Sequence, residues 1–141
     1  MLGEVARAID ALAEALAALG EAYELVDEAN ADRLESEIFA PVQAAYGRAK
    51  RTHAAFATFA GLPPASFAPA PAGHPSQGAA GFLQAAVDAV ADADTVLSEL
   101  QDSMRPVEVG DAELRAGLAE TRQLLATVRV RAVAFKRTLG R

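Results

Sequence analysis

The chain has 141 residues, of which 52% are hydrophobic and 23% are charged, and its formal net charge is −6. This composition is typical of one folded domain and excludes a disordered or fibrous chain. The absence of cysteine excludes disulfides and cysteine-ligated metals. We expect a cytoplasmic protein with no signal peptide and no membrane span, and we do not expect nucleic acid as a partner because the chain is acidic.

The first predicted helix runs from about residue 2 to about residue 29. Its large apolar residues recur at alternating steps of three and four, which places them on one stripe of a helix. These residues are Leu2, Val5, Ile9, Leu12, Leu16, Leu19, Tyr23 and Val26. Either Asn30 or Asp32 is expected to cap the next helix.

The second predicted helix carries the same spacing and ends near Gly61. Its apolar stripe is Leu34, Ile38, Val42, Ala45, Ala49, Thr52, Phe56 and Phe59. Pro41 lies inside this pattern and predicts either a kink in the first turns or a helix start after a short turn.

Residues 61–77 contain five prolines and predict the one long connection between helices. Two interpretations stay open for this segment. It is either an ordered, irregular crossover with Leu62 and Phe67 as apolar anchors, or a disordered stretch of low complexity.

Two further helices follow, the third capped by Ser76 and stopped by Pro106, and the fourth capped by Asp111. The third stripe is Ala79, Leu83, Ala86, Val90, Ala93, Leu97, Leu100 and Met104. The fourth is Leu114, Leu118, Thr121, Leu125, Val128, Ala132, Phe135 and Leu139.

Four such helices, joined by short connections within each half, predict an all-α fold. We expect residues 1–141 to form one antiparallel, up-down-up-down four-helix bundle, with 61–77 crossing between helices two and three. In that topology one core layer has little side-chain volume, and it lies near His53; its members are Ile9, Thr52, Ala86 and Ala132. The sequence predicts a small cavity there, or an inserted Phe67 or Phe82, or helices that approach more closely.

Charge is segregated along the sequence. The charged residues among the first 40 are mainly acidic, and those among the last 27 are mainly basic. Residues 41–75 contain no acidic residue. In the predicted topology the second and fourth helices end together, so one end of the molecule would be basic and the other acidic.

The apolar stripes hold almost no polar side chain besides Thr52 and Thr121. Di-iron and haem bundles need ligands that project inward, so we expect neither a metal nor a cofactor.

One short motif suggests chemistry, because Arg48 and His53 form an Arg-x-x-x-x-His pattern. It resembles the signature of HEPN domains, helical bundles that include ribonucleases. The resemblance implies that Arg48 and His53 assist attack of a ribose hydroxyl on the neighbouring phosphate. Ala49 departs from the pattern, in which this position is usually polar. In the other interpretation His53 borders the core and Arg48 lies on the helix surface.

Apolar residues also fall on predicted outer faces, where helices gain little from them. They are Ala126, Val130 and Val133 on the fourth helix and Ala11, Ala18 and Leu25 on the first. These strips predict a two-fold symmetric homodimer or another protein partner, with a monomer as the alternative. We therefore expect a non-catalytic scaffold or protein-interaction module. The alternatives are the HEPN-like ribonuclease and a small-molecule-binding bundle.

Overall fold

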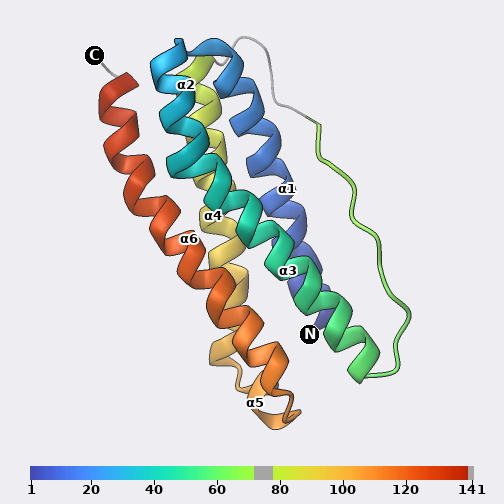
Figure 1. The fold of residues 1–141 in the computed structure, drawn as a ribbon. Coiled ribbons are helices and arrows are strands. Elements are labelled where there is room, and N and C mark those ends of the chain that lie inside the picture. The colour runs from blue at the N-terminus through green and yellow to red at the C-terminus, as the bar shows by residue number, and fades with distance from the viewer. Residues whose placement is uncertain (72–77, 140–141) are drawn as a thin grey trace.

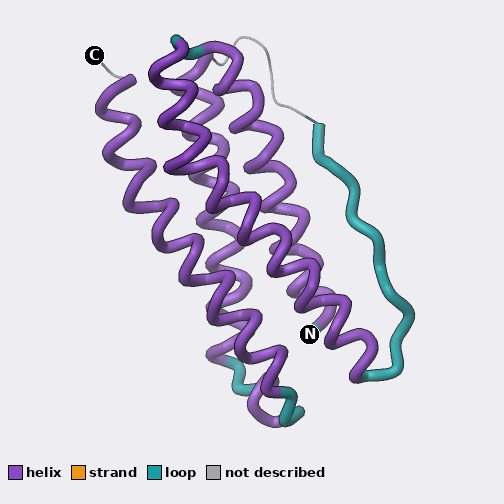
Figure 2. Tube along the Cα trace, viewed as in Figure 1, coloured by secondary structure: helices purple, strands orange, loops and turns teal. Residues whose placement is uncertain are grey.

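The computed structural model describes residues 1–71 and 78–139. Within these ranges every regular element is a helix and none is a strand (Figure 2), so the predicted all-α class is confirmed. The elements are α1 (Leu2–Leu25), α2 (Glu28–Leu34), the π-helical turn η1 (Glu35–Phe39), α3 (Ala40–Phe59), α4 (Gly78–Asp102), α5 (Arg105–Glu108) and α6 (Ala112–Leu139).

The four long helices α1, α3, α4 and α6 lie side by side (Figure 1). The most extensive contacts join α1 to α4 and α3 to α6, and smaller contacts join α1 to α3 and α4 to α6. Their apolar faces form one continuous core. Leu12, Leu19, Leu97 and Leu125 are fully buried in it.

Two contacts fix the relative direction of α3 and α6. Glu37, just before α3, meets Arg131 of α6, whose Nη1 donates to the Glu37 carbonyl at 3.1 Å. Arg48, farther along, donates through Nε to Oε2 of Glu120 at 2.6 Å. Later positions on α3 therefore meet earlier positions on α6, so the two helices are antiparallel.

A third contact fixes the direction of α4. Glu4 in the first turn of α1 accepts a hydrogen bond from Nη2 of Arg105, which follows the end of α4, at 2.7 Å. The helices α1 and α4 are therefore antiparallel, and α4 runs in the same direction as α3 (Figure 1). The predicted up-down-up-down order is wrong; the order along the chain is up-down-down-up.

The length of chain between α3 and α4 explains this difference. Residues 60–77 separate Phe59 from Gly78. Extended chain covers about 3.3 Å per residue, so this stretch can reach about 60 Å, whereas the 25 residues of α4 span about 37 Å. The chain can therefore return along the whole molecule before α4 begins, a possibility that helix periodicity cannot exclude.

The predicted apolar stripes on α3, α4 and α6 are buried except near their ends, where Phe59 and Met104 are exposed. On α1 the buried face is rotated. Tyr23 is exposed and Leu16 is only partly buried. Five alanines of α1 are buried in addition to the large residues: Ala8, Ala13, Ala15, Ala18 and Ala22. Small residues let α1 lie close to α4, which favours this rotation.

The break after α1 comes earlier than predicted. Val26 is extended, with ψ of 163°, and Asp27 caps α2 by accepting a hydrogen bond from the Asn30 backbone N–H at 2.8 Å. The expectation that Asn30 or Asp32 is the cap is therefore wrong. For α6, Oδ1 of Asp111 accepts a hydrogen bond from the Glu113 N–H at 3.1 Å, so that predicted cap is confirmed. Ser76 lies outside the described residues.

Pro41 lies in the first turn of α3 and does not interrupt the helical backbone. Proline has no N–H for the carbonyl four residues earlier, and its ring crowds that carbonyl. The π-helical turn η1 directly precedes it and widens the backbone there. The affected carbonyl, that of Glu37, instead accepts from Arg131 of α6.

Two basic residues in the middle of α6 lie beside an acidic residue of α4. Asp94 of α4 pairs with Arg122 at 2.8 Å and with Arg129 at 3.3 Å. The predicted basic and acidic ends are wrong because α3 and α6 are antiparallel, so their C-terminal ends lie far apart (Figure 1). Among the described helices, none combines the length and hydrophobicity needed to span a lipid bilayer.

Candidate functional site

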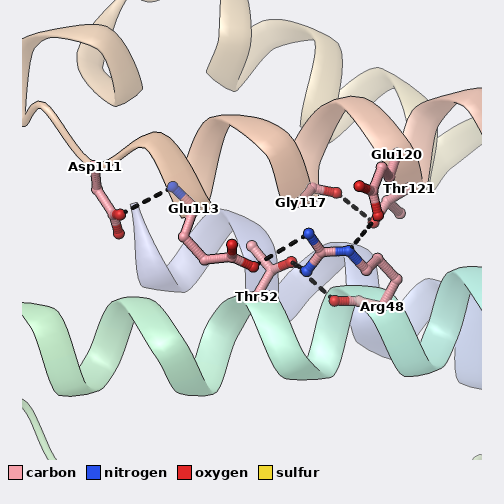
Figure 3. Close-up of polar contacts among 7 residues, drawn as sticks. All are labelled: Arg48, Thr52, Asp111, Glu113, Gly117, Glu120 and Thr121. Atoms are coloured by element: carbon pink, nitrogen blue, oxygen red, sulfur yellow. Dashed lines mark hydrogen bonds and ion pairs between the residues drawn. The ribbon is translucent and has the colours of Figure 1, made fainter.

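Arg48 of α3 occupies the interface between α3 and α6 (Figure 3). Its Nε lies 2.6 Å from Oε2 of Glu120, and its Nη2 lies 3.2 Å from Oε1 of Glu113. Nη1 donates to Oγ1 of Thr52 at 3.1 Å. The hydrogen bond to Glu120 raises the pKa of Arg48, partly opposed by its burial, and Glu113 adds to the increase. The guanidinium is therefore a charged link between two helices.

At Thr52, α3 approaches α6 closely. A Cβ built on Gly117 would lie 2.0 Å from Oγ1 of Thr52, so a glycine is needed opposite this side chain. The Thr52 hydroxyl donates to the carbonyl of Arg48 at 2.8 Å, and the Thr121 hydroxyl donates to the carbonyl of Gly117 at the same distance. The two buried threonines thus satisfy their polar groups within their own helices.

His53 contacts a different part of the molecule. Its ring packs edge-on against Phe67, with centroids 5.1 Å apart, and only 4% of the residue is exposed. Burial lowers the pKa of His53. Phe67 packs against the core from the connecting segment, residues 60–71, as expected for an anchor. Leu62 is exposed, so the expectation that it also anchors the segment is wrong.

These positions bear on the ribonuclease alternative. Arg48 is held by carboxylates of α6, whereas His53 is buried against Phe67. The structure therefore brings each side chain to a different neighbour, and the arrangement does not favour a shared cleft for RNA. Within residues 1–71 and 78–139, no group of three or more His, Cys, Asp or Glu side chains could hold a metal ion.

The five residues of the candidate cavity are all buried: Ile9, Thr52, His53, Ala86 and Ala132. The structure does not bring them into one layer. Thr52 lies opposite Gly117, and Ala132 is 15 residues later on α6, which corresponds to about 22 Å along the helix. The layer was built on the up-down-up-down order, so it fails with that order. Phe82 is buried in the core.

The predicted outer strip on α6 is exposed to solvent. Val130 is 74% exposed and Val133 is 56% exposed, and Ala126 is exposed beside them. The second strip, on α1, is not continuous. Leu25 is exposed and Ala11 is partly buried, but Ala18 is buried because the face of α1 that packs in the core includes it.

No protein-family model matches this chain, and comparisons with curated proteins and with solved structures found no match.

Sequence reasoning missed the partners of Arg48, although a signal exists. Glu113 and Glu120 are seven residues apart, so they lie on one face of α6. It also missed the contact between Tyr46 and Lys50 of α3. Tyr46 forms a groove together with residues of the connecting segment, and the path of that segment could not be predicted from the sequence.

Proposed function

We propose that this chain is a non-catalytic four-helix bundle that acts as a protein-interaction module through the outer face of α6. The observation that supports this most directly is the exposure of two β-branched residues, Val130 and Val133, on one side of a helix. Valine is less favourable than alanine or a long polar residue on an exposed helix surface. Burial against a partner would give these side chains a stabilising role.

The spacing of the exposed residues supports a helix as the partner. Ala119, Ala126, Val130 and Val133 follow one another in steps of seven, four and three, and all are exposed. This is the periodicity of a stripe that packs along a second helix. Ala126 is two positions, or about 200°, from the buried Val128, so the stripe lies opposite the core.

A second copy of this chain is the partner we propose, with the two α6 helices antiparallel about a two-fold axis. The first half of α6 carries two acidic and two basic residues and so has no net charge, whereas its second half carries Arg129, Arg131, Lys136 and Arg137 and no acidic residue. An antiparallel arrangement about a two-fold axis near residue 128 sets the basic half of one copy beside the neutral half of the other. A parallel arrangement would instead place the two basic halves together.

Light scattering at micromolar concentration tests the proposal. We expect the mass of a dimer for the wild type and of a monomer for Val130→Glu combined with Val133→Glu, because four carboxylates would be buried at the interface. The matched control is Val107→Glu combined with Val109→Glu, which adds the same charge to exposed valines near α5 and should leave the dimer intact.

Two results would count against the proposal. A monomeric wild type at this concentration excludes a stable homodimer. A dimer that survives the substitutions at 130 and 133 shows that another face forms the contact.

A further inference from the structure

A second surface feature lies away from the outer face of α6. A groove of about 250 Å³ runs between α1, α3 and the connecting segment. Apart from the hydroxyl of Tyr46, its lining side chains are apolar: Ala13, Leu16, Ala17, Tyr46, Pro69 and Ala70. Leu16 belongs to the apolar stripe of α1, yet it is only partly buried because the groove opens beside it. This leaves apolar surface available to a ligand.

A cation lies at the border of this groove. Nζ of Lys50 is 4.4 Å from the centroid of the Tyr46 ring, which is part of the groove wall. One turn of helix separates the two residues, so the lysine stem folds back over the ring. Its ammonium can bind the ring face and still donate hydrogen bonds, since it has three donors.

The positive charge beside the groove is not neutralised within the described chain. No carboxylate lies within ion-pair distance of Lys50 or Arg51 there, and residues 41–75 contain no acidic residue. Arg48, on the same helix, is paired with two glutamates. Within the described residues, Lys50 and Arg51 thus form a local positive charge in a chain of net charge −6.

The same two cations line a second groove, of about 350 Å³, which Phe67 also lines. Its lining residues are Lys50, Arg51, Ala54, Ala65, Ser66 and Phe67. Both grooves lie between α3 and the connecting segment, so Lys50 connects an apolar surface to a cationic one. Along α3, Tyr46 of the first groove is followed one turn later by Lys50 and one further turn later by Ala54, which both line the second groove.

We propose that this pair of grooves binds a small amphipathic anion, a carboxylate with a short unbranched apolar chain. The apolar chain lies on Leu16, Tyr46 and Pro69, where burial supplies affinity. The carboxylate accepts hydrogen bonds from Lys50 and Arg51, which orients the ligand. A neutral chain would leave both cations without a partner, and a free phosphate would leave the apolar wall exposed, so charge and shape favour an amphiphile.

Octanoate is a suitable ligand for the test, and 1-octanol is its neutral counterpart. We would titrate each into the ¹⁵N-labelled full chain and follow backbone amide shifts. Octanoate should cause saturable shifts at Ala13, Leu16, Ala17 and Ala70, with octanol binding about tenfold more weakly. This mapping uses the wild-type protein and does not depend on a variant that folds.

Lys50→Met keeps the apolar stem and removes the charge, so octanoate should bind about tenfold more weakly to it. The matched control is Lys136→Met, because Lys136 is the second lysine of the chain and lies on α6. It should bind octanoate as the wild type does. The proposal is overturned if octanoate shifts no groove amide, if octanol binds as tightly, or if Lys50→Met binds octanoate unchanged. Octanoate binding should be the same in the Val130→Glu, Val133→Glu variant, which separates this site from the proposed dimer.

Discussion

Gly117→Ala is a sharp test of the packing between α3 and α6. In a helix interior alanine is more favourable than glycine by about 1 kcal/mol, so the substitution should stabilise the protein wherever space allows. Position 117 does not allow it. The new Cβ would lie 2.0 Å from Oγ1, 2.7 Å from Cγ2 and 2.9 Å from Cβ of Thr52.

The conflict cannot be relieved by a side-chain rotation alone. The Cβ of Thr52 is fixed to the α3 backbone, and its hydroxyl is held by the Arg48 carbonyl. The two helices must therefore separate, and overpacking of this kind costs about 1–3 kcal/mol or more. After the gain in helix propensity is subtracted, we expect the free energy of unfolding to fall by about 2 kcal/mol.

Urea denaturation of the wild type and four variants measures this effect. Gly20→Ala is the matched control, because a Cβ there meets nothing within 4 Å; it should raise the free energy of unfolding by about 0.5–1 kcal/mol. In Thr52→Ala, two of the three close atoms are absent, so Gly117→Ala should cost less in that background. A Gly117→Ala protein as stable as the wild type would refute the close approach described above.

Two further predictions concern pH. Burial lowers the pKa of His53, so the unfolded state binds the proton more readily; stability is retained above the ordinary value of 6.5 and decreases as pH falls below it. His53→Phe should remove this dependence of stability on pH, measured as the change in the thermal unfolding temperature between about pH 7.5 and 5. The same pH dependence in the variant and the wild type would contradict the prediction. Hydrogen bonds from Arg105 and from the N-terminal amine lower the pKa of Glu4 to about 2 from 4.5, so the stabilisation from these contacts is complete above pH 4.5 and is lost as pH falls towards 2. The ion pair between Glu4 and Arg105 is partly exposed, so it should contribute about 1 kcal/mol or less to the free energy of unfolding. Glu4→Gln should therefore lose less stability than the wild type when the pH is lowered. An equal loss in the two proteins would exclude this role for Glu4.

Helix periodicity predicted the buried residues well because the alternating steps of three and four recur along α3, α4 and α6. Leu97 and Leu125 are examples in which spacing alone identified a core side chain. The stripe of α1 was predicted less well. Alanine occurs on both the buried and the partly exposed faces of α1, so its positions do not show which face is buried. The small side chains nevertheless determine how closely α1 approaches α4, and so Ala18 is buried while Tyr23 is exposed.

The direction of α4 could not be predicted, because an apolar stripe has the same pattern whether the helix runs up or down. The ion pairs between Glu4 and Arg105 and between Arg48 and Glu120 carry that information, but each joins residues far apart in the sequence. For the same reason, the sequence could not show whether Arg48 and His53 share one site. Arg48 and His53 are five residues apart, and only the positions of α6 and Phe67 show that they contact different neighbours.

The order of the helices has a consequence for synthesis of the chain. The main neighbour of α1 is α4, and the contact between Glu4 and Arg105 spans 101 positions. Loop closure over such separations slows folding relative to helical proteins with sequential neighbours. On the ribosome, α1 can pair with α3 but must wait for α4 before its alanine face is covered. We therefore expect the nascent chain to expose this face until residue 102 has emerged.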